Sequence, residues 1–523
     1  MKEPQVIIVG GGPVGAALAL DLGLRGVSSV VVESRKSLAN IPKGQGLTQR
    51  TLEHFYFWGL DEELRAARLM PRGYPIGEIT AYGNLAGEYW HAPAGREVVG
   101  DFFFQKQERL PQYCTEAVLR RKLAALPNVE LRLNVSATEV AQSNDGVRAT
   151  VTNERGEMET LEADYLVGCD GGHSMVREAA GIARDGTDFD QVMALIVFRS
   201  RALHEQLARF PERSTYRVMH PDLHGYWKFF GRVDVGERFF FHAPVPPEAR
   251  RDGFDFSAPL FDAAGFEFAF EVEHAGFWEL RNAVAASYRN GRIFIAGDAA
   301  HSHPPYGGYG LNNGLEDAVN LSWKLAACFA GWGGEQLLDS YSFERAPVFR
   351  DVAEDFIAAR IREDDAFLTR YNPARDRAAF EAAWNARVTD VGSRRLAYEP
   401  SYEASPVVLG PPGGKTTAHG VHSLKARAGH HLSPQVLSNS RNVFEEFGRG
   451  FTLLALGANA AVFEQAAAQR QVPLKIVRDS GQAARDNYGA SLILVRPDQH
   501  VAWAGDTASD ADADAIMRKV TGQ

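Results

Sequence analysis

Cysteine is scarce in this sequence, and its few cysteines are far apart. Cys114, Cys169 and Cys328 are the only three among 523 residues, and their spacing fits neither a disulfide framework nor a metal site. Isolated cysteines of this kind are usually small, buried apolar residues. None follows Cys328, so the last part of the chain cannot hold a redox-active dithiol.

Long apolar runs and an excess of basic charge are also missing. No stretch of 18 apolar residues occurs, so we expect no membrane-spanning helix. The net charge of -10 and the pI near 5.9 argue against nucleic acid as a partner. A predicted strand begins so close to Met1 that a signal peptide has no room before it, and we expect a cytoplasmic enzyme.

The start of the chain carries the clearest motif. Residues 6–15 read VIIVGGGPVG, which predicts a buried strand running into a glycine turn, and residues 16–23 predict a helix. Strand, Gly-x-Gly-x-x-Gly and helix together form the dinucleotide-binding fingerprint. In this fingerprint Gly10 makes the tight turn, Gly12 lets the backbone approach a pyrophosphate, and Gly15 lets the helix pack closely. The N-terminus of the helix then holds the phosphate charge.

A second predicted strand, residues 30–32, ends at Glu33. An acidic residue about 20 positions past the glycines suits a hydrogen bond to a ribose 2′-hydroxyl and disfavours a 2′-phosphate. With two strands, a helix and Glu33 in place, the sequence predicts a dinucleotide site. The alternative is a glycine-rich turn in an ordinary α/β unit.

The rest of the chain divides into parts with different patterns. Helices are predicted at 48–60, 112–126, 315–330 and 337–360, and strands at 75–105, 129–140, 147–153, 161–167 and 292–298. Between 187 and 280 aromatic and β-branched residues alternate, which indicates an antiparallel sheet inserted into the first domain. Residues 400–434, rich in Pro, Gly and His, indicate a linker or irregular cover, and the last block has a βαβ…ββ pattern.

Three separated motifs resemble one protein family. After the first glycine turn come DGGHSMVR at 170–177 and GDAAH at 297–301, which continues through PPYGGYGLN at 304–312. Together they resemble the single-component (class A) flavoprotein aromatic hydroxylases, the group that contains phenol hydroxylase and 4-hydroxybenzoate hydroxylase. The last block resembles the thioredoxin-like domain of the phenol hydroxylase subgroup, mainly through VRPD at 495–498 and Trp503.

The resemblance implies an α/β fold with three domains. It predicts a Rossmann-like FAD-binding domain with an inserted, mostly antiparallel β-sheet substrate domain, followed by a C-terminal thioredoxin-like α/β domain. We expect the FAD-binding domain at 1–180 and 285–400, the substrate domain at 181–284 and the C-terminal domain at 401–523, with strands near 75–105 joining the substrate sheet. Without redox cysteines, the C-terminal domain is expected to serve docking or to support a homodimer.

FAD is the cofactor that the resemblance implies, with NADPH or NADH as a transient co-substrate. No second Gly-x-Gly-x-x-Gly follows a predicted strand, so the nicotinamide cofactor has no domain of its own, and the choice between NADH and NADPH stays open. The residues expected to bind cofactor are Gly10, Gly12, Pro13, Gly15, Glu33, Ser34, Lys43, Gln112, Asp170, Asp298, Pro305, Gly308, Gly310, Leu311 and Asn312.

Several of these residues have a specific role in the resemblance. Asp298 matches an aspartate that accepts hydrogen bonds from the ribityl chain, and its alternative role is to cap the next turn. Gln112 matches a glutamine beside the flavin, and its alternative is an ordinary polar residue at a helix start. The backbone N–H groups of 310–312 would stabilise negative charge on reduced flavin. Asp170 and Arg177 match a motif for FAD and NAD(P)H, although Arg177 suits a structural role in its turn equally well.

The implied reaction is hydroxylation of a small phenolic or related aromatic substrate with NAD(P)H and O2, through a flavin hydroperoxide. One residue departs from the phenol hydroxylases, because Gln45 replaces an aspartate that activates the phenol, and an amide cannot act as a general base. Either another group deprotonates the phenol or the substrate needs less activation. The candidate catalytic residues are Gln45, His220, His224, Tyr226, Arg232 and Tyr306, with surface or packing roles as the alternative.

Other functions stay open at this point. The same scaffold would support an epoxidase or Baeyer–Villiger-type oxygenase acting on a polyketide ring, and a different class would be an FAD-binding redox or interaction module without oxygenase activity. A halogenase is disfavoured because no Trp-x-Trp-x-Ile-Pro segment occurs. His301 and His303 lack a third ligand at a convincing spacing, so no metal site is predicted.

Overall fold

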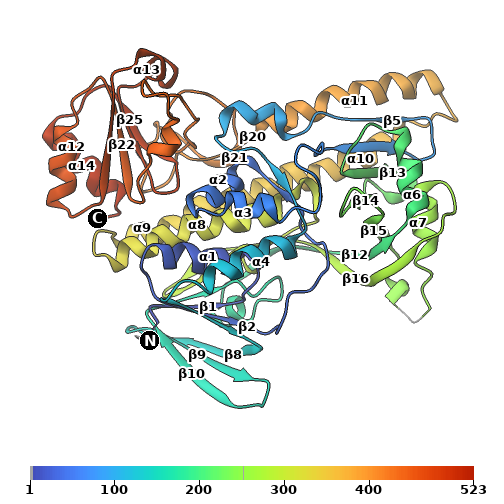
Figure 1. The fold of residues 1–523 in the computed structure, drawn as a ribbon, viewed down its shortest axis with the longest axis horizontal. Coiled ribbons are helices and arrows are strands. Elements are labelled where there is room, and N and C mark those ends of the chain that lie inside the picture. The colour runs from blue at the N-terminus through green and yellow to red at the C-terminus, as the bar shows by residue number, and fades with distance from the viewer. Residues whose placement is uncertain (1–3, 251–252) are drawn as a thin grey trace.

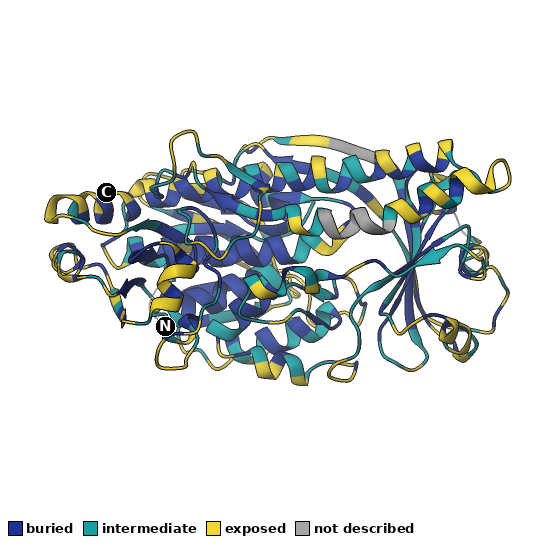
Figure 2. Ribbon diagram, turned by 90° about the horizontal axis from the view of Figure 1, so that it is seen from above, coloured by how far each residue is buried: buried dark blue, intermediate teal, exposed yellow. Residues whose placement is uncertain are grey.

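The computed structural model describes residues 4–250 and 253–523 and places them in three regions along one long axis (Figure 1). A central region of sheet and helices lies between a second sheet, at the right of the view, and the C-terminal region, at the left. In Figure 2 buried residues fill the central region, and exposed residues gather on loops and outward helix faces. Among the described residues, no helix has the length and apolarity needed to cross a bilayer.

The central sheet has six strands in the order β17-β18-β11-β1-β2-β7, which are parallel except for the β17–β18 pair. β1 is wholly buried because it lies between β2 and β11, which explains its uninterrupted apolar sequence. The chain leaves β1 for β2 on one side and later returns to β11 on the other, and ligands bind at such a switch point. The strands are β1 (Val6–Val9), β2 (Ser29–Glu33), β7 (Val129–Leu133), β11 (Tyr165–Gly168), β17 (Arg289–Asn290) and β18 (Ile293–Ile295).

Helices pack around this sheet, and α1 lies against both α4 and α8. The predicted helix at 337–360 is longer than expected, since α9 continues through a π-helical turn at Val352–Ala358 into α10. The helices of this region are α1 (Pro13–Leu24), α2 (Gln49–Phe57), α3 (Asp61–Ala66), α4 (Gln112–Leu123), α5 (Met175–Ala179), α8 (Tyr309–Phe329), α9 (Glu335–Asp351), α10 (Ala359–Arg370) and α11 (Arg377–Ala397).

Helix α11 was not predicted, although the sequence contains signals for it. The Asp376 side chain accepts a hydrogen bond from the backbone N–H of Ala379 at 3.0 Å and so caps its start. Phe380 and Trp384, four residues apart, are buried in one cluster with Phe367. In Figure 1 α10 leads towards the second sheet, and α11 returns from there towards β20.

The second sheet has eight strands in the order β19-β16-β12-β15-β14-β13-β4-β5 and is antiparallel except between β4 and β13. β4 and β5 come from the 75–105 stretch, whose remainder forms a 3-10 helix, η1 (Arg96–Phe102), instead of further strands. The strands are β4 (Glu78–Tyr82), β5 (Trp90–His91), β12 (Arg184–Arg199), β13 (Thr215–Met219), β14 (Trp227–Arg232), β15 (Arg238–Val245), β16 (Glu271–Ala285) and β19 (His301–Ser302).

The two faces of this sheet have different partners. Its outer face, with Phe198 and Phe230, packs in a cluster with residues of the helices α6 (Arg201–Gln206) and α7 (Ser257–Ala264). Its inner face, with Val197 and Phe240, packs against Ile41, which belongs to the loop that follows β2. The inner face therefore meets the part of the central region that carries the predicted cofactor residues.

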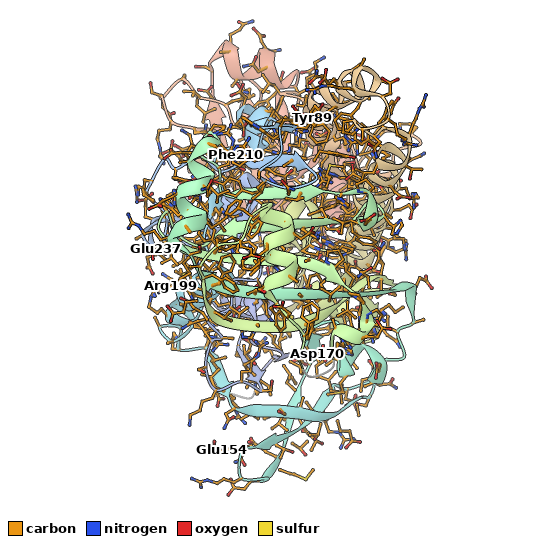
Figure 3. The ribbon with its side chains drawn as sticks, turned by 90° about the vertical axis from the view of Figure 1, so that its right-hand side faces the viewer. Tyr89, Glu154, Asp170, Arg199, Phe210 and Glu237 are labelled. Atoms are coloured by element: carbon orange, nitrogen blue, oxygen red, sulfur yellow. The ribbon has the colours of Figure 1, made fainter. Side chains whose placement is uncertain are left out.

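Two further small sheets complete the central region. The expected single strand at 161–167 is split at Asp164, because the chain passes there from a three-stranded sheet into the central one. Figure 3 shows Glu154 at the tip of this three-stranded sheet, away from the rest of the molecule. Its strands are β8 (Val135–Gln142), β9 (Val147–Asn153) and β10 (Met158–Ala163), and a two-stranded ladder joins β3 (Gly46–Leu47) to β6 (Glu108–Arg109).

The C-terminal region has the strands and the helix that were predicted from residue 451 onwards. It also has two helices, α13 and α14, and two short strands, β20 and β21, that were not predicted, and β21 lies in the stretch expected to be a linker or irregular cover. Its core includes Trp323 and Leu337 from α8 and α9, so it shares a buried interface with the central region. Its elements are β20 (Tyr398–Tyr402), β21 (Thr416–His419), β22 (Phe451–Leu456), α12 (Ala461–Gln469), β23 (Leu474–Asp479), α13 (Gln482–Tyr488), β24 (Leu492–Val495), β25 (Val501–Gly505) and α14 (Asp510–Val520).

Candidate functional site

The glycines of the first turn have two different surroundings: two are packed tightly against backbone atoms, and one borders open space. A Cβ atom on Gly10 would lie 2.3 Å from the carbonyl oxygen of Cys169, and one on Gly15 would lie 1.9 Å from the carbonyl oxygen of Gly10. A Cβ atom on Gly12 would meet no atom within 4 Å. Because Gly12 precedes α1, whose first turn starts at Pro13 and has no acidic residue, this open space suits the pyrophosphate of FAD.

Glu33 lies at the carboxyl end of β2 beside this turn. Its carboxylate is 4% exposed and accepts hydrogen bonds from the backbone N–H groups of Gly11 at 2.8 Å and Arg35 at 2.9 Å. The Arg35 Nε atom also lies 3.4 Å from Oε1, so of the roughly four acceptor positions of the carboxylate about one remains for a ribose hydroxyl. Ser34 follows Glu33 and is exposed.

Asp298 has the surroundings expected for a residue that faces a cofactor space. Its side chain is surrounded by many protein atoms, but it is exposed to solvent-sized space, as is typical of a residue on the wall of a cavity. Burial raises the pKa of Asp298, while the charges of His301 and Lys43 oppose that shift. A carboxylate in this position would accept hydrogen bonds from the hydroxyls of a ribityl chain.

Three segments far apart in the sequence meet next to these residues. The Gln112 amide oxygen accepts from the backbone N–H of Gly44 at 3.4 Å, and a Cβ atom on Gly44 would lie 3.1 Å from Leu311. Gly310 and Leu311 lie in the first turn of α8, where N–H groups have no partner within the helix. Pro305 and Gly308, which precede this turn, are exposed. The pieces expected to hold the flavin end of FAD are therefore assembled.

Asn312 has a different role from its neighbours. Its side chain donates to the carbonyl oxygens of Gly46 at 2.9 Å and Gly308 at 2.6 Å, and it accepts from the backbone N–H of Thr48 at 2.9 Å. The amide is thus used within the protein and joins the 46–48 loop to α8. Only the backbone of Asn312 is left for a cofactor.

Asp170 and Arg177 close their own turn. The Asp170 carboxylate accepts from the Ser174 hydroxyl at 2.5 Å and from the backbone N–H of Val176 at 3.1 Å, at the start of α5. Arg177 contacts the carbonyl oxygen of Gly172 and the carboxylate of Glu178. Both side chains therefore stabilise the turn between β11 and α5, which is the alternative role that the sequence analysis gave for Arg177. Figure 3 shows Asp170 between the eight-stranded sheet and the three-stranded one.

Tyr306 and Tyr226 are brought together, whereas the other catalytic candidates from the inserted sheet are not. Tyr306 is buried and stacks on Trp227, and its ring centroid lies 6.4 Å from that of Tyr226. Its hydroxyl has no hydrogen-bond partner among the residues that the structure describes. Burial raises the pKa of Tyr306 well above its usual value. This phenol therefore stays protonated and acts as a hydrogen-bond donor.

Arg232, His220 and His224 lie elsewhere. Arg232 is five residues from Trp227 on β14 and so projects from the opposite face, where it contacts the Tyr216 hydroxyl at 3.1 Å and His204 at 3.0 Å. The side chains of His220 and His224 are 39% and 83% exposed in the turn after β13. The structure thus does not bring these three residues to the flavin loop, because strand alternation and the turn direct them away from it.

His242 is an inner-face residue that the sequence analysis missed. Its Nδ1 atom accepts a hydrogen bond from the Trp278 indole at 3.2 Å, and burial lowers its pKa to about 3. The neutral ring therefore carries its proton on Nε2, which makes it a donor and a poor general base at neutral pH. No motif surrounds His242, so only its place on the inner face identifies it.

The low pKa of His242 gives a pH-dependent stability. In the unfolded state His242 takes up a proton near pH 6.5, whereas in the folded state it does so only near pH 3. Its contribution to the free energy of unfolding is therefore fully present above pH 6.5 and is lost as the pH falls below that value. Between pH 6.5 and 4.5 this histidine should account for about 2 kcal/mol of lost stability. Urea unfolding of His242→Gln should show a shallower decline than the wild type, with His224→Gln as the control for the substitution itself. Equal declines in wild type and His242→Gln would contradict this assignment.

Gln45 and Arg109 are buried polar residues with unused hydrogen-bonding groups. Gln45 is 5% exposed and neither its amide nitrogen nor its amide oxygen has a partner. Arg109 is 9% exposed, its Nε and Nη2 atoms have no partner, and its guanidinium lies 6.0 Å from the centroid of Phe240 on the inner face. Burial lowers the pKa of Arg109 to about 10. Buried polar groups without hydrogen-bond partners lower the stability of the fold unless a ligand supplies the missing hydrogen bonds.

A cavity of about 320 Å3 lies beside the flavin loop. The backbone of Gly307 and Gly308 forms part of its wall, together with residues of η1, α8, α10, α11 and the C-terminal region. Arg360, another wall residue, lies with its guanidinium 5.8 Å from the centroid of Trp227, which stacks on Tyr306. The cavity therefore borders the flavin loop, and Arg360 links its wall to Trp227 on the sheet.

The fold, the open glycine turn and the gathered flavin residues define an FAD-dependent enzyme, and comparisons with known proteins agree. Residues 3–355 match the family model described as an FAD binding domain, and residues 425–523 match the aromatic-ring hydroxylase C-terminal domain. The chain belongs to the class A flavoprotein aromatic hydroxylases and is an FAD-dependent monooxygenase. The family predicted from the three sequence motifs is thus confirmed, as is the mixed α/β fold.

Similar proteins match over almost the whole chain. A 4-methyl-5-nitrocatechol 5-monooxygenase from Burkholderia sp. is 31% identical over 98% of this chain and 96% of its own length. A 3-(3-hydroxy-phenyl)propionate/3-hydroxycinnamic acid hydroxylase from Burkholderia cenocepacia is 29% identical over 99% of this chain and 96% of its own. The solved structure of the flavin-dependent monooxygenase PieE with FAD and substrate has a TM-score of 0.86 at 26% identity, covering 100% of this chain and 99% of that one.

Proposed function

We propose that this enzyme hydroxylates a compact phenolic aromatic compound that binds in the cavity beside Gly307 and Gly308. The observation that carries the proposal is that the cavity is lined by Gly307 and Gly308 of the flavin loop and by Arg360, whose guanidinium lies 5.8 Å from the ring centroid of Trp227 on the sheet. Its volume of about 320 Å3 is at the lower end of the range for ligand sites, which favours one or two rings over a large polycyclic substrate.

The overall reaction balances as aromatic substrate, O2, NAD(P)H and a proton giving hydroxylated product, water and NAD(P)+. Bound FAD would accept the hydride and activate oxygen, because no amino-acid side chain can carry out these two steps. The Gly12 turn would hold the pyrophosphate and Asp298 the ribityl hydroxyls. The N–H groups at the start of α8 would stabilise negative charge on the reduced ring.

The candidate groups of the flavin loop, the inner sheet face and the 45–47 segment favour a substrate that needs little activation. Tyr306 stays protonated, His242 is too weak a base, and Gln45 cannot take up a proton. These groups can orient a ring by hydrogen bonding, but none of them can deprotonate a phenol at neutral pH. We therefore expect a phenol that ionises easily or a ring that is already electron-rich.

The activity is tested by measuring NADPH and NADH oxidation by the FAD-loaded protein, with and without a panel of phenols and phenolic acids. We expect strong stimulation by at least one compound, together with a product heavier by one oxygen atom. FAD binding without stimulation by any compound would contradict the proposal and favour the polyketide-ring alternative. A homodimer and a cytoplasmic location stay predictions.

A further inference from the structure

Arg217 on β13 is a deeply buried arginine whose guanidinium is fixed by an ion pair. The residue is 2% exposed, and it pairs with Asp364 of α10, whose side chain is 1% exposed. The other carboxylate oxygen of Asp364 contacts Arg387 of α11. Because separating buried charges of opposite sign is costly, Arg217 keeps one position relative to α10.

The same guanidinium lies over the indole ring of Trp227. Its distance from the ring centroid is 4.1 Å, within the range of a cation–π contact, whereas Arg360 lies farther away at 5.8 Å. Met219 is the strand partner of Trp227, and Arg217 lies two residues before Met219, so Arg217 is a diagonal neighbour of Trp227 on the same sheet face. Both residues are buried, which strengthens the contact because water does not screen it.

Trp227 in turn packs against the flavin loop, residues 303–308. Its ring stacks on the buried ring of Tyr306, with 3.2 Å between the centroids. Tyr306 directly precedes Gly307 and Gly308, which line the cavity. The contacts therefore form a continuous path from α10 through the sheet to the cavity wall.

The flavin loop depends on the packing of Tyr306 for its position. Gly307 and Gly308 have positive φ angles of 71° and 68°, which glycine adopts with little strain. Arg96 and Asn312 each donate to one carbonyl oxygen of these glycines. The Tyr306 hydroxyl has no partner among the described residues, so ring packing is what anchors this side chain in the sheet.

The turn that leads into β14 lies directly on α10, and Figure 1 shows α10 next to β13 and β14. Gly225 in this turn has a φ angle of +81°, and a Cβ atom there would lie 2.0 Å from the carbonyl oxygen of Ile361. Trp227 begins β14 two residues later. The close approach of Gly225 thus places the start of the strand on α10, and Arg217 then fixes the orientation of the Trp227 ring.

We propose that Arg217 is a positioning residue for the bound flavin. Through Trp227 and Tyr306 it holds the flavin loop where the loop shields the ring of FAD from solvent and keeps it aligned with the substrate. Loss of this contact would let the loop move while FAD stays bound. NADPH and O2 would then give more hydrogen peroxide and NADP+, at the expense of hydroxylated product. Only this last consequence rests on the proposed function.

The first test is quenching of flavin fluorescence by iodide in the FAD-loaded protein without substrate. In Arg217→Met the quenching constant should rise at least about threefold, since a desolvated cation–π contact can change an equilibrium about tenfold. Asp364 keeps Arg387 as its partner, so this variant leaves no buried acid unpaired. Arg217→Lys should recover most of the shielding, because its ammonium can still pair with Asp364 and lie over the indole.

A double-mutant cycle separates this role from a general structural one. Trp227→Leu should raise the quenching constant as Arg217→Met does, and the double variant should show little more than either single change, because both remove the same contact. Trp227→Phe keeps a ring for both contacts and should stay close to the wild type. The circular dichroism spectrum and FAD content of each variant establish that it is folded and loaded.

Arg209→Met is the matched control. Arg209 is an exposed arginine of the same domain whose guanidinium lies 5.1 Å from the ring centroid of Phe210, so the variant removes a similar contact in the outer cluster. It should leave the quenching constant unchanged.

The second test is the yield of hydrogen peroxide per NADPH with a phenol that the enzyme hydroxylates. Arg217→Met should raise this yield at least about threefold. The KM for the phenol should change little, because Arg217 is not among the described residues that line the cavity.

Two results would overturn the inference. One is a wild-type quenching constant in both Arg217→Met and Trp227→Leu. The other is a double variant whose effect is the product of the two single effects, which would show that Arg217 does not act through Trp227. If quenching responds as expected but no phenol stimulates NADPH oxidation, the positioning role stands and the proposed function fails. Hydroxylation with unchanged quenching in Arg217→Met would reject this inference and keep the proposed function.

Discussion

Replacing Gly12 by valine should abolish tight FAD binding and leave the apoprotein folded. A Cβ atom on Gly12 meets no protein atom within 4 Å, so the larger side chain has space in the free protein. The same space is where the backbone must approach the pyrophosphate. We expect FAD affinity to fall by at least about 100-fold, which corresponds to about 3 kcal/mol. Titration of the apoprotein with FAD, followed by flavin fluorescence, measures the change.

Neighbouring glycines provide the controls for this result. Gly15→Val should not give a folded protein, because its Cβ atom would lie 1.9 Å from the carbonyl oxygen of Gly10. Gly100→Val in η1, where a Cβ atom also meets open space, should bind FAD normally. Unchanged FAD affinity in Gly12→Val would show that the pyrophosphate lies elsewhere.

Replacing Arg496 by methionine should destabilise the attachment of the C-terminal region by ~3–5 kcal/mol, the usual cost of leaving buried charges unpaired. Arg496 is fully buried and contacts both carboxylate oxygens of Glu344 on α9, at 2.6 and 2.9 Å, and both of Asp498. Burial alone would raise the pKa of Glu344, but Arg496 and Lys324 hold it well below its usual range. Without Arg496, Lys324 alone must balance two buried acids.

The readout is a lower unfolding temperature together with faster proteolysis between residues 400 and 450. Arg518→Met on α14 is the matched control, because Arg518 is exposed and pairs only with Asp514. It should change stability by less than about 0.5 kcal/mol. If Arg496→Met melts like the wild type and resists protease equally, the ionic cluster does not hold the two regions together.

The local pattern at the start of the chain was sufficient to predict the elements that carry the cofactor half of the candidate site. β1, the glycine turn, α1 and Glu33 follow directly from residue type and spacing, and the later motifs end on the neighbouring strands of the same sheet. Parallel strands bring their carboxyl ends to one edge, so motifs far apart in sequence meet there. Asp298 follows β18 at this edge, whereas Gln112 begins α4, and the roles of both were predicted from the family resemblance.

The substrate half could not be predicted in the same way. Alternation along β14 puts Arg232 and Trp227 on opposite faces, but only the packing of the sheet decides which face is turned towards the central region. Arg109 lies in a two-residue strand without any motif, and Arg217 becomes significant only because Asp364 and Trp227, which are far apart in the sequence, both contact it. These are consequences of tertiary packing, which single-sequence patterns do not contain.

The most direct test of the account is the source of the oxygen atom in the product. The FAD-loaded enzyme should be incubated with NADPH and its best phenolic substrate under ¹⁸O2 in ordinary water, and the product analysed by mass spectrometry. The account predicts a product that carries one ¹⁸O atom, formed in step with NADPH consumption. A product labelled only from H2¹⁸O, or NADPH oxidation that yields hydrogen peroxide with every compound tested and no hydroxylated product, would contradict it.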